Sequence, residues 1–213
     1  MIDFSKVYLK FAKEYYALCN VNLKIADGER VCLLGEKDSG KTSILRVVAG
    51  LEKEYTGDVF IANKNQKELD YRYDISVGYV PKKGVFFEQK TVMQNMMYAL
   101  NLRNKGLTPY ESEELIRNVL TKFDLVDFSD IKVKKLKSKQ RYMLAFARLN
   151  LRKLDILLVD NIWNNIEDLE DIKKALLLLA DENKCTVIIA SEDEGVISDL
   201  DFKIVKMHAG IID

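Results

Sequence analysis

The sequence predicts an α/β fold with a parallel central sheet, an antiparallel β subdomain at the N-terminus and a helical insertion. Short strand-like segments occupy the first third of the chain, and apolar residues at helical spacing occupy the middle third. Two apolar runs, at residues 155–159 and 186–190, suit strands that are buried on both faces. Such an alternation of strands and helices is typical of α/β folds.

The remaining elements follow from periodicity and turn residues. The expected strands of the first third are residues 6–10, 20–25, 30–34, 57–62 and 76–80. The expected helices are residues 92–104, 111–123, 140–151 and 169–182. The chain closes with a predicted hairpin of residues 202–207 and 211–212 that turns at Ala209-Gly210. We expect one domain over residues 1–213, with a β subdomain and core at 1–81 and 150–213 and a helical subdomain at 82–149.

Composition narrows the class of protein. The chain has 213 residues, 48% apolar and 31% charged, with a formal net charge of zero, which argues against a strongly basic nucleic-acid binder. Its three cysteines, Cys19, Cys32 and Cys185, are far apart and lie in apolar runs, as buried thiols of a reducing compartment do. The start does not resemble a signal peptide, and no apolar run is long enough to span a bilayer. We therefore expect a cytoplasmic protein that contacts a membrane only through a partner.

The most informative stretch is GEKDSGKT, from Gly35 to Thr42, which matches the phosphate-binding P-loop pattern G-x-x-x-x-G-K-[ST]. A β-like run precedes it and an apolar helical run follows, so backbone N–H groups and a helix N-terminus point at one spot. Lys41 is expected to reach the β- and γ-phosphates, and Thr42 to offer its hydroxyl to Mg²⁺. The alternative is a chance loop of these residue types. The candidate nucleotide-binding residues are Gly35, Asp38, Ser39, Gly40, Lys41, Thr42 and Ser43.

Two acidic residues bear on the interpretation of this loop as a nucleotide-binding site. Asp38 stands where many P-loops carry a small residue, and it adopts left-handed backbone geometry less readily than glycine, so we expect weakened nucleotide affinity. Asp160 ends the apolar run 155–159 and is a candidate to hold Mg²⁺ beside Thr42. An ordinary strand-terminal aspartate is the alternative for Asp160.

Further short motifs follow one another in a characteristic order along the whole chain. They are Phe11 with residues 17–21, GYVP at 78–81, VMQN at 92–95, LKSKQR at 136–141 with AFAR at 145–148, residues 155–160, and VIIAS at 187–191. In this order and spacing the chain resembles the ATP-binding cassette (ABC) proteins, the nucleotide-binding subunits of membrane transporters. The resemblance implies a RecA-like P-loop NTPase core, ATP and Mg²⁺ as cofactors, and Phe11 as the aromatic that stacks on adenine.

The chain departs from the family pattern at the positions that serve hydrolysis. Lys82 replaces the glutamine that senses Mg²⁺ and water, Asn161 replaces the catalytic glutamate, and Glu192 replaces the switch histidine. Asn161 has no useful basicity, Glu192 would repel the γ-phosphate, and Lys82 is a cation near a metal ion. The acid of the following loop falls at Glu167. We therefore expect weak or absent hydrolysis, with an active ATPase whose residues compensate as the alternative.

The family's signature, usually LSGGQ, is LKSKQ here, so that Lys137, Ser138, Lys139 and Gln140 stand at its functional positions. Side chains at Ser138 and Lys139 would obstruct the close approach to phosphate that two glycines allow. Lysine could instead grip phosphate as a point charge, and a solvated basic face is an equal alternative. The surrounding basic cluster comprises Lys132, Lys134, Lys135, Lys137, Lys139 and Arg141.

The resemblance also implies partners. Cassettes pair head to tail and dock on membrane-spanning permeases, so we expect a protein peripheral to the inner face of the cell membrane. An unlike second cassette is expected in preference to a second copy, because each site of a homodimer would combine two damaged halves. Gly84, Val85, Phe86, Phe87, Met93, Met96, Met97 and Tyr98 fall where the family receives its permease, or else pack a core. A scaffold or regulator without transport is the remaining alternative.

Overall fold

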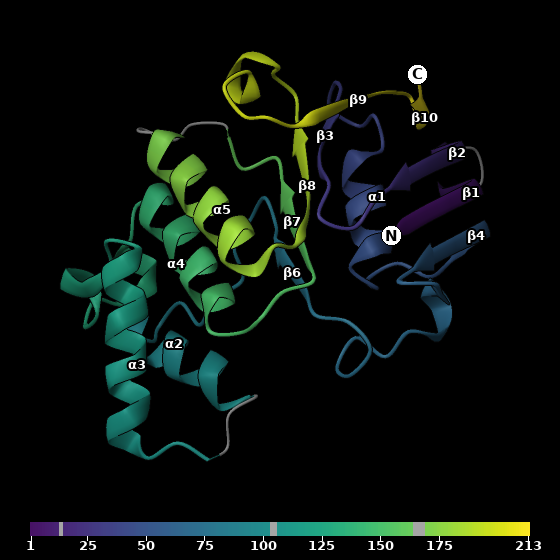
Figure 1. The fold of residues 1–213 in the computed structure, drawn as a ribbon. Coiled ribbons are helices and arrows are strands. Elements are labelled where there is room, and N and C mark those ends of the chain that lie inside the picture. Colours follow the sequence, from purple (N-terminus) through teal and green to yellow (C-terminus); the bar gives the residue numbers. More distant parts are fainter. Residues whose placement is uncertain (13–14, 103–105, 164–168) are drawn as a thin grey trace. The chain divides into compact units, whose positions relative to one another are not determined.

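The computed structural model describes residues 1–12, 15–102, 106–163 and 169–213, apart from the side chains of residues 11 and 12 (Figure 1). The chain divides into two compact units. The first comprises Met1–Lys82, Leu154–Trp163 and Lys184–Asp213, and the second comprises Lys83–Lys153 together with helix α5 (Leu169–Asn183). The sequence prediction drew the helical subdomain at residues 82–149, without α5.

The first unit begins with an antiparallel sheet of strand order β2-β1-β4-β5. Its strands are β1 (Ile2–Ala12), β2 (Tyr15–Ile25), β4 (Tyr55–Ile61) and β5 (Lys64–Asn65). Buried and exposed residues alternate along β2 and β4, as expected where one sheet face covers a core and the other meets solvent. The predicted antiparallel β subdomain is thus present, with β1 and β2 longer than periodicity indicated.

The second sheet of this unit has the order β10-β9-β3-β8-β7-β6. Its strands are β3 (Arg30–Leu34), β6 (Val77–Val80), β7 (Ile156–Asp160), β8 (Thr186–Ser191), β9 (Lys203–His208) and β10 (Ile211–Ile212). All neighbours pair in parallel except β9 with β10. Every residue of β7 and β8 is buried, as the two apolar runs predicted.

Helix α1 (Lys41–Val48) joins the two sheets into one core. Its buried residues, among them Ile44, Leu45 and Val48, pack with apolar side chains of both sheets in a single cluster. The parallel register aligns Leu34 with Ser191 and Asp160 with Ala190. The carboxyl ends of β3, β7 and β8 therefore meet at one edge, which is where parallel sheets place ligand sites.

The second unit is helical. It contains α2 (Val92–Asn101), α3 (Pro109–Lys122), α4 (Ser138–Asn150) and α5, and α4 packs against each of the other three. Thr91 and Thr108 cap α2 and α3 with reciprocal side-chain and backbone hydrogen bonds, so the helices begin immediately after these threonines. None of the helices that the structure describes is long and apolar enough to cross a bilayer.

Candidate phosphate-binding site

The Gly35–Thr42 loop connects β3 to α1 and rests directly on neighbouring backbone. A Cβ atom on Gly35 would lie 2.2 Å from the carbonyl oxygen of Met207, and one on Gly40 would lie 2.5 Å from that of Ala17. Gly40 also has a φ of +100°, a conformation that side chains disfavour. Both glycines of the motif are therefore required by the way the loop packs in the first unit.

Backbone hydrogen bonds fix the loop to the end of β8 and to the turn between β9 and β10. The N–H of Gly35 donates to the carbonyl of Ser191 at the end of β8, over 3.2 Å. The N–H of Gly210, in the hairpin turn between β9 and β10, donates to the carbonyl of Ser39 over 3.1 Å. The carbonyl of Gly210 in turn accepts from the N–H of Cys19 on β2. The C-terminal hairpin thus forms part of the surface against which the loop packs.

Lys41 is 5% exposed, and its ammonium is held by the loop itself. It donates to the carbonyls of Gly35 and Glu36 over 2.7 and 2.6 Å and to Oγ of Ser39 over 2.8 Å. Burial lowers the pKa of Lys41, and the nearby carboxylates of Glu192 and Asp160 partly oppose that shift. A buried cation encircled by loop backbone is suited to an anionic ligand that takes over some of these hydrogen bonds.

Asp160 and Thr42 lie in direct contact. The hydroxyl of Thr42 donates to one carboxylate oxygen of Asp160 over 2.9 Å, and the hydroxyl of Tyr79 donates to the other over 2.9 Å. Burial, with a contribution from the Asp160 charge, raises the pKa of Tyr79, which keeps its proton on the phenol. The buried carboxylate and the hydroxyl offer adjacent oxygens of the kind that Mg²⁺ prefers, so these residues fit a bound magnesium ion.

A pocket of about 360 Å³ opens beside the loop, within the size range of small-ligand sites. All of its lining residues belong to the first unit: Tyr15, Ala17, Lys37, Asp38, Ser39, Gly40, Lys41, Thr42, Ser43, Lys82, Asn161 and Glu192. The structure therefore brings the loop residues together with Lys82, Asn161 and Glu192, which lie far apart in sequence. The side chain of Phe11 and the residue Glu167 lie outside the described residues.

Asn161 and Glu192 form a pair at the carboxyl ends of β7 and β8. The amide nitrogen Nδ2 of Asn161 donates a hydrogen bond to the carboxylate of Glu192. The amide oxygen Oδ1 of Asn161 is buried and, within the part of the chain that the structure describes, has no hydrogen-bond partner. Asn161 also has a φ of +45°, which asparagine tolerates better than most residues. Sequence reasoning identified both positions but not their contact.

Two tyrosines at the site were not anticipated. Tyr15 lines the pocket, and its hydroxyl donates to the carbonyl of Asp38 over 3.1 Å. Tyr79 supports Asp160, as described above. Neither tyrosine belongs to a phosphate-binding motif. The only feature of the sequence that could have indicated them was an aromatic residue in a strand near the loop. Asp38 itself has a φ of +63°, so the loop does impose left-handed geometry on a non-glycine residue.

The signature residues lie in the second unit, at the start of α4. Gln140 caps this helix by accepting a hydrogen bond from the N–H of Lys137 over 2.7 Å. The ammonium of Lys139 pairs with Asp171 on α5, and Arg141 pairs with Glu88. Ion pairs therefore neutralise two members of the basic cluster within this unit.

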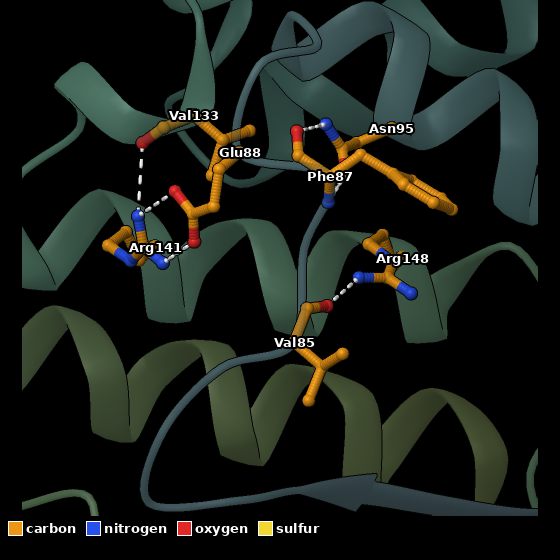
Figure 2. A network of polar contacts seen from close by, with 7 residues as sticks. All are labelled: Val85, Phe87, Glu88, Asn95, Val133, Arg141 and Arg148. Carbon is orange, nitrogen blue, oxygen red and sulfur yellow. Dashed lines mark hydrogen bonds and ion pairs between the residues drawn. The ribbon is translucent and has the colours of Figure 1, made fainter.

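Residues 85–88 are fixed to α4 and α2 by the contacts in Figure 2. Arg141 donates to Glu88 and to the carbonyl of Val133, and Arg148 donates to the carbonyl of Val85 over 2.7 Å. The side chain of Asn95 both donates to and accepts from the backbone of Phe87. These contacts hold the segment against α4 and α2, although Val85 and Phe87 are 77% and 47% exposed.

Comparison with known proteins assigns the family. The family described as ABC transporter matches residues 18–164, more than half of the chain. The sulfate/thiosulfate import ATP-binding proteins CysA of Halalkalibacterium halodurans and of Pseudomonas aeruginosa are each 30% identical over 203 residues, which is 93% of this chain but 57% and 61% of those proteins. The chain therefore belongs to the ABC transporter family, and it spans about three fifths of the length of these relatives.

Solved structures agree with this assignment. A dimeric post-hydrolysis state of the ATP-binding cassette MJ0796 bound to ADP and Pi has a TM-score of 0.86 and 26% identity, covering 100% of this chain and 97% of that one. A nucleotide-free cassette from an ABC transporter, at 20% identity and a TM-score of 0.78, shares the fold. The core of this chain is thus the P-loop NTPase core of an ABC cassette.

The left-handed backbone of Asp38 leads to a prediction. Asp38→Gly should raise the free energy of unfolding by about 0.5–1 kcal/mol, because glycine adopts positive φ without strain. It should also tighten phosphate-ligand binding, because a carboxylate leaves the pocket. Asp124→Gly is the matched control, since Asp124 has a φ of +52° and does not line the pocket. Chemical denaturation should show similar gains in stability for both variants. Titration with the phosphate ligand should show tighter binding for Asp38→Gly alone. Equal effects of the two variants on binding would contradict the assignment of Asp38 to the phosphate-binding pocket.

Proposed function

We propose that this chain is the ATP-binding subunit of an ABC-type transporter, with residues 1–213 acting as one cassette domain. The observation that carries the proposal is the pocket around Lys41, in which a buried ammonium, the loop backbone and the Thr42–Asp160 pair converge. Lys41 would bind the β- and γ-phosphates, and Thr42 and Asp160 would hold an Mg²⁺ ion that offsets the phosphate charge. Phe11 is proposed to stack on adenine.

We propose that hydrolysis is weak or absent. Asn161 stands where a general base is needed, and an amide does not take a proton from water. Its Nδ2 donates to Glu192, whose negative charge at the pocket would repel a γ-phosphate bound there. Lys82 adds a cation to the same pocket. Losing one oriented group costs about 10²–10³ in rate, so the combined changes leave little turnover.

The membrane partner is proposed to bind the exposed apolar side chains of the second unit. Val85, Phe87 and Tyr98 are 77%, 47% and 49% exposed, and the rings of Phe87 and Tyr98 pack edge to face. Met96 is fully buried and belongs to the core, whereas Met93 and Met97 are partly exposed. A segment that is held in place and presents apolar side chains fits a permease, and the complex would sit at the inner face of the cell membrane.

The second cassette is proposed to be an unlike chain. Each site of an ABC dimer combines the P-loop of one chain with the signature of the other, so an intact partner would supply one undamaged half to each site. Lys139 is already paired with Asp171, which leaves Lys137 as the better candidate to reach a partner's γ-phosphate. No role in nucleic-acid binding is proposed.

The first prediction tests nucleotide binding. Lys41→Ala should abolish binding of a fluorescent Mg·ATP analogue that wild-type protein binds with modest affinity, because the buried cation contacts the phosphates. Lys24→Ala is the control, since Lys24 lies on β2, is exposed and does not line the pocket. Titration of the three proteins decides the matter. If wild type does not bind, or if Lys41→Ala binds equally well, the P-loop assignment is wrong.

The second prediction concerns hydrolysis. Asn161→Glu should fail to restore ATPase activity, since it would place a second carboxylate against Glu192 and a bulkier residue at a φ of +45°. A phosphate-release assay should give rates for wild type and Asn161→Glu that match the Lys41→Ala background. A wild-type turnover of about one per second that Lys41→Ala abolishes would contradict the proposal.

The third prediction concerns the dimer. In size-exclusion chromatography with light scattering, the protein should stay monomeric in Mg·ATP, because both halves of a homodimeric site are altered. When a genuine partner cassette is present, Lys137→Ala should reduce joint ATP turnover more than Lys139→Ala, whose lysine already has a partner. A stable ATP-dependent homodimer argues against an unlike partner, and unchanged turnover with Lys137→Ala removes any phosphate role for that lysine.

A further inference from the structure

We infer that Glu192, held by Asn161, makes this pocket selective for nucleoside diphosphate over nucleoside triphosphate. The inference rests on the proposed function, because it concerns the ligand of the same pocket. It goes beyond that function because it assigns to Glu192 the role of selecting nucleotides by their number of phosphate groups.

The position of Glu192 follows from the sheet. Ser191 ends β8, pairs with Leu34 at the end of β3, and accepts the N–H of Gly35. Glu192 is the next residue, so its backbone leaves the sheet directly beside the start of the phosphate-binding loop. On the other side, Asn161 follows Asp160 at the end of β7 and donates its N–H to the carbonyl of Ala190 on β8. Glu192 therefore emerges between the loop and Asp160.

The hydrogen bond from Asn161 holds the carboxylate in that place. Nδ2 of Asn161 donates to the Glu192 carboxylate, and both side chains line the pocket with Lys41 and Thr42. Asn161 is 6% exposed, so its side chain has little freedom to turn away. A histidine at position 192, whether neutral or cationic, would make a different contact with Asn161. Although Glu192 is an exposed residue, this hydrogen bond brings its negative charge to the pocket.

That charge lies at the end of the pocket where a terminal phosphate is expected. Lys41 of a P-loop serves the β- and γ-phosphates, and Thr42 and Asp160 would hold a metal ion that supplies positive charge to the phosphates. Glu192 and Lys41 line the same pocket, so the carboxylate lies near the Lys41 ammonium. The carboxylate thus already supplies Lys41 with part of the negative charge that a γ-phosphate would bring.

The charges around Glu192 do not reverse this conclusion. Lys37, Lys41 and Lys82 line the pocket on the positive side, and Asp38 and Glu192 line it on the negative side, with Asp160 behind Thr42. A diphosphate satisfies Lys41 and the loop N–H groups without approaching Glu192. A triphosphate brings an additional negative charge against it, and neighbouring like charges typically change an equilibrium by about tenfold to a thousandfold.

The test is calorimetric titration of Mg·ADP and of the Mg complex of a β,γ-methylene ATP analogue, which resists cleavage. Wild-type protein should bind the diphosphate at least about tenfold more tightly. Glu192→Gln keeps an acceptor for Asn161 but removes the charge, so it should lower the ratio about tenfold or more through tighter triphosphate binding. Glu194→Gln is the matched control, because Glu194 is an exposed acid two residues away that does not line the pocket.

The outcomes separate the two proposals. Binding that requires Lys41 but shows no preference for diphosphate, or a preference that Glu192→Gln leaves unchanged, overturns the role of Glu192 and leaves the proposed function standing. Absence of binding by either nucleotide overturns both. If Glu192→Gln does not fold, as judged by thermal unfolding, Glu192→Ala replaces it with the same expected change in ratio.

Discussion

The close approach of the Gly35–Thr42 loop to the backbone of β2 and β9 is the constraint on which the rest of the site depends. Glycine at positions 35 and 40 lets the loop lie against the carbonyls of Met207 and Ala17. This packing directs the Lys41 side chain inward, and helix α1 begins at the same residue. Any Cβ there would displace the loop from Ala17 and Met207, which are themselves buried. The site is therefore determined first by backbone packing and only then by charge.

The parallel register supplies the remaining groups. Because β3, β8 and β7 are adjacent and aligned, the residues that follow them meet around the loop. Asp160 receives hydrogen bonds from Thr42 and Tyr79, and Asn161 engages Glu192. The first pair preserves what binding of a metal–phosphate complex requires. The Asn161–Glu192 pair is the contact on which the proposal of weak or absent hydrolysis rests.

The sequence was sufficient for the fold class and the loop, since both depend on local patterns. Residues 156–159 are apolar throughout and form most of β7, and the GEKDSGKT motif stands between a strand and a helix as expected. Contacts between distant residues were not accessible in this way. The Asn161–Glu192 hydrogen bond depends on strand register, and the support of Asp160 by Tyr79 depends on the pairing of β6 with β7. The grouping of α5 with the helical unit likewise comes from packing between elements.

The central claim is that the pocket binds nucleotide phosphate through Lys41 without turning it over. The most direct measurement is the fate of bound nucleotide in a single loading: protein in excess is mixed with Mg·ATP labelled on the α-phosphate, and the bound fraction is collected on a filter and separated by chromatography over time. The account predicts label retained by wild type but not by Lys41→Ala, and recovered as ATP after many minutes. Conversion of the retained label to ADP within seconds would contradict it.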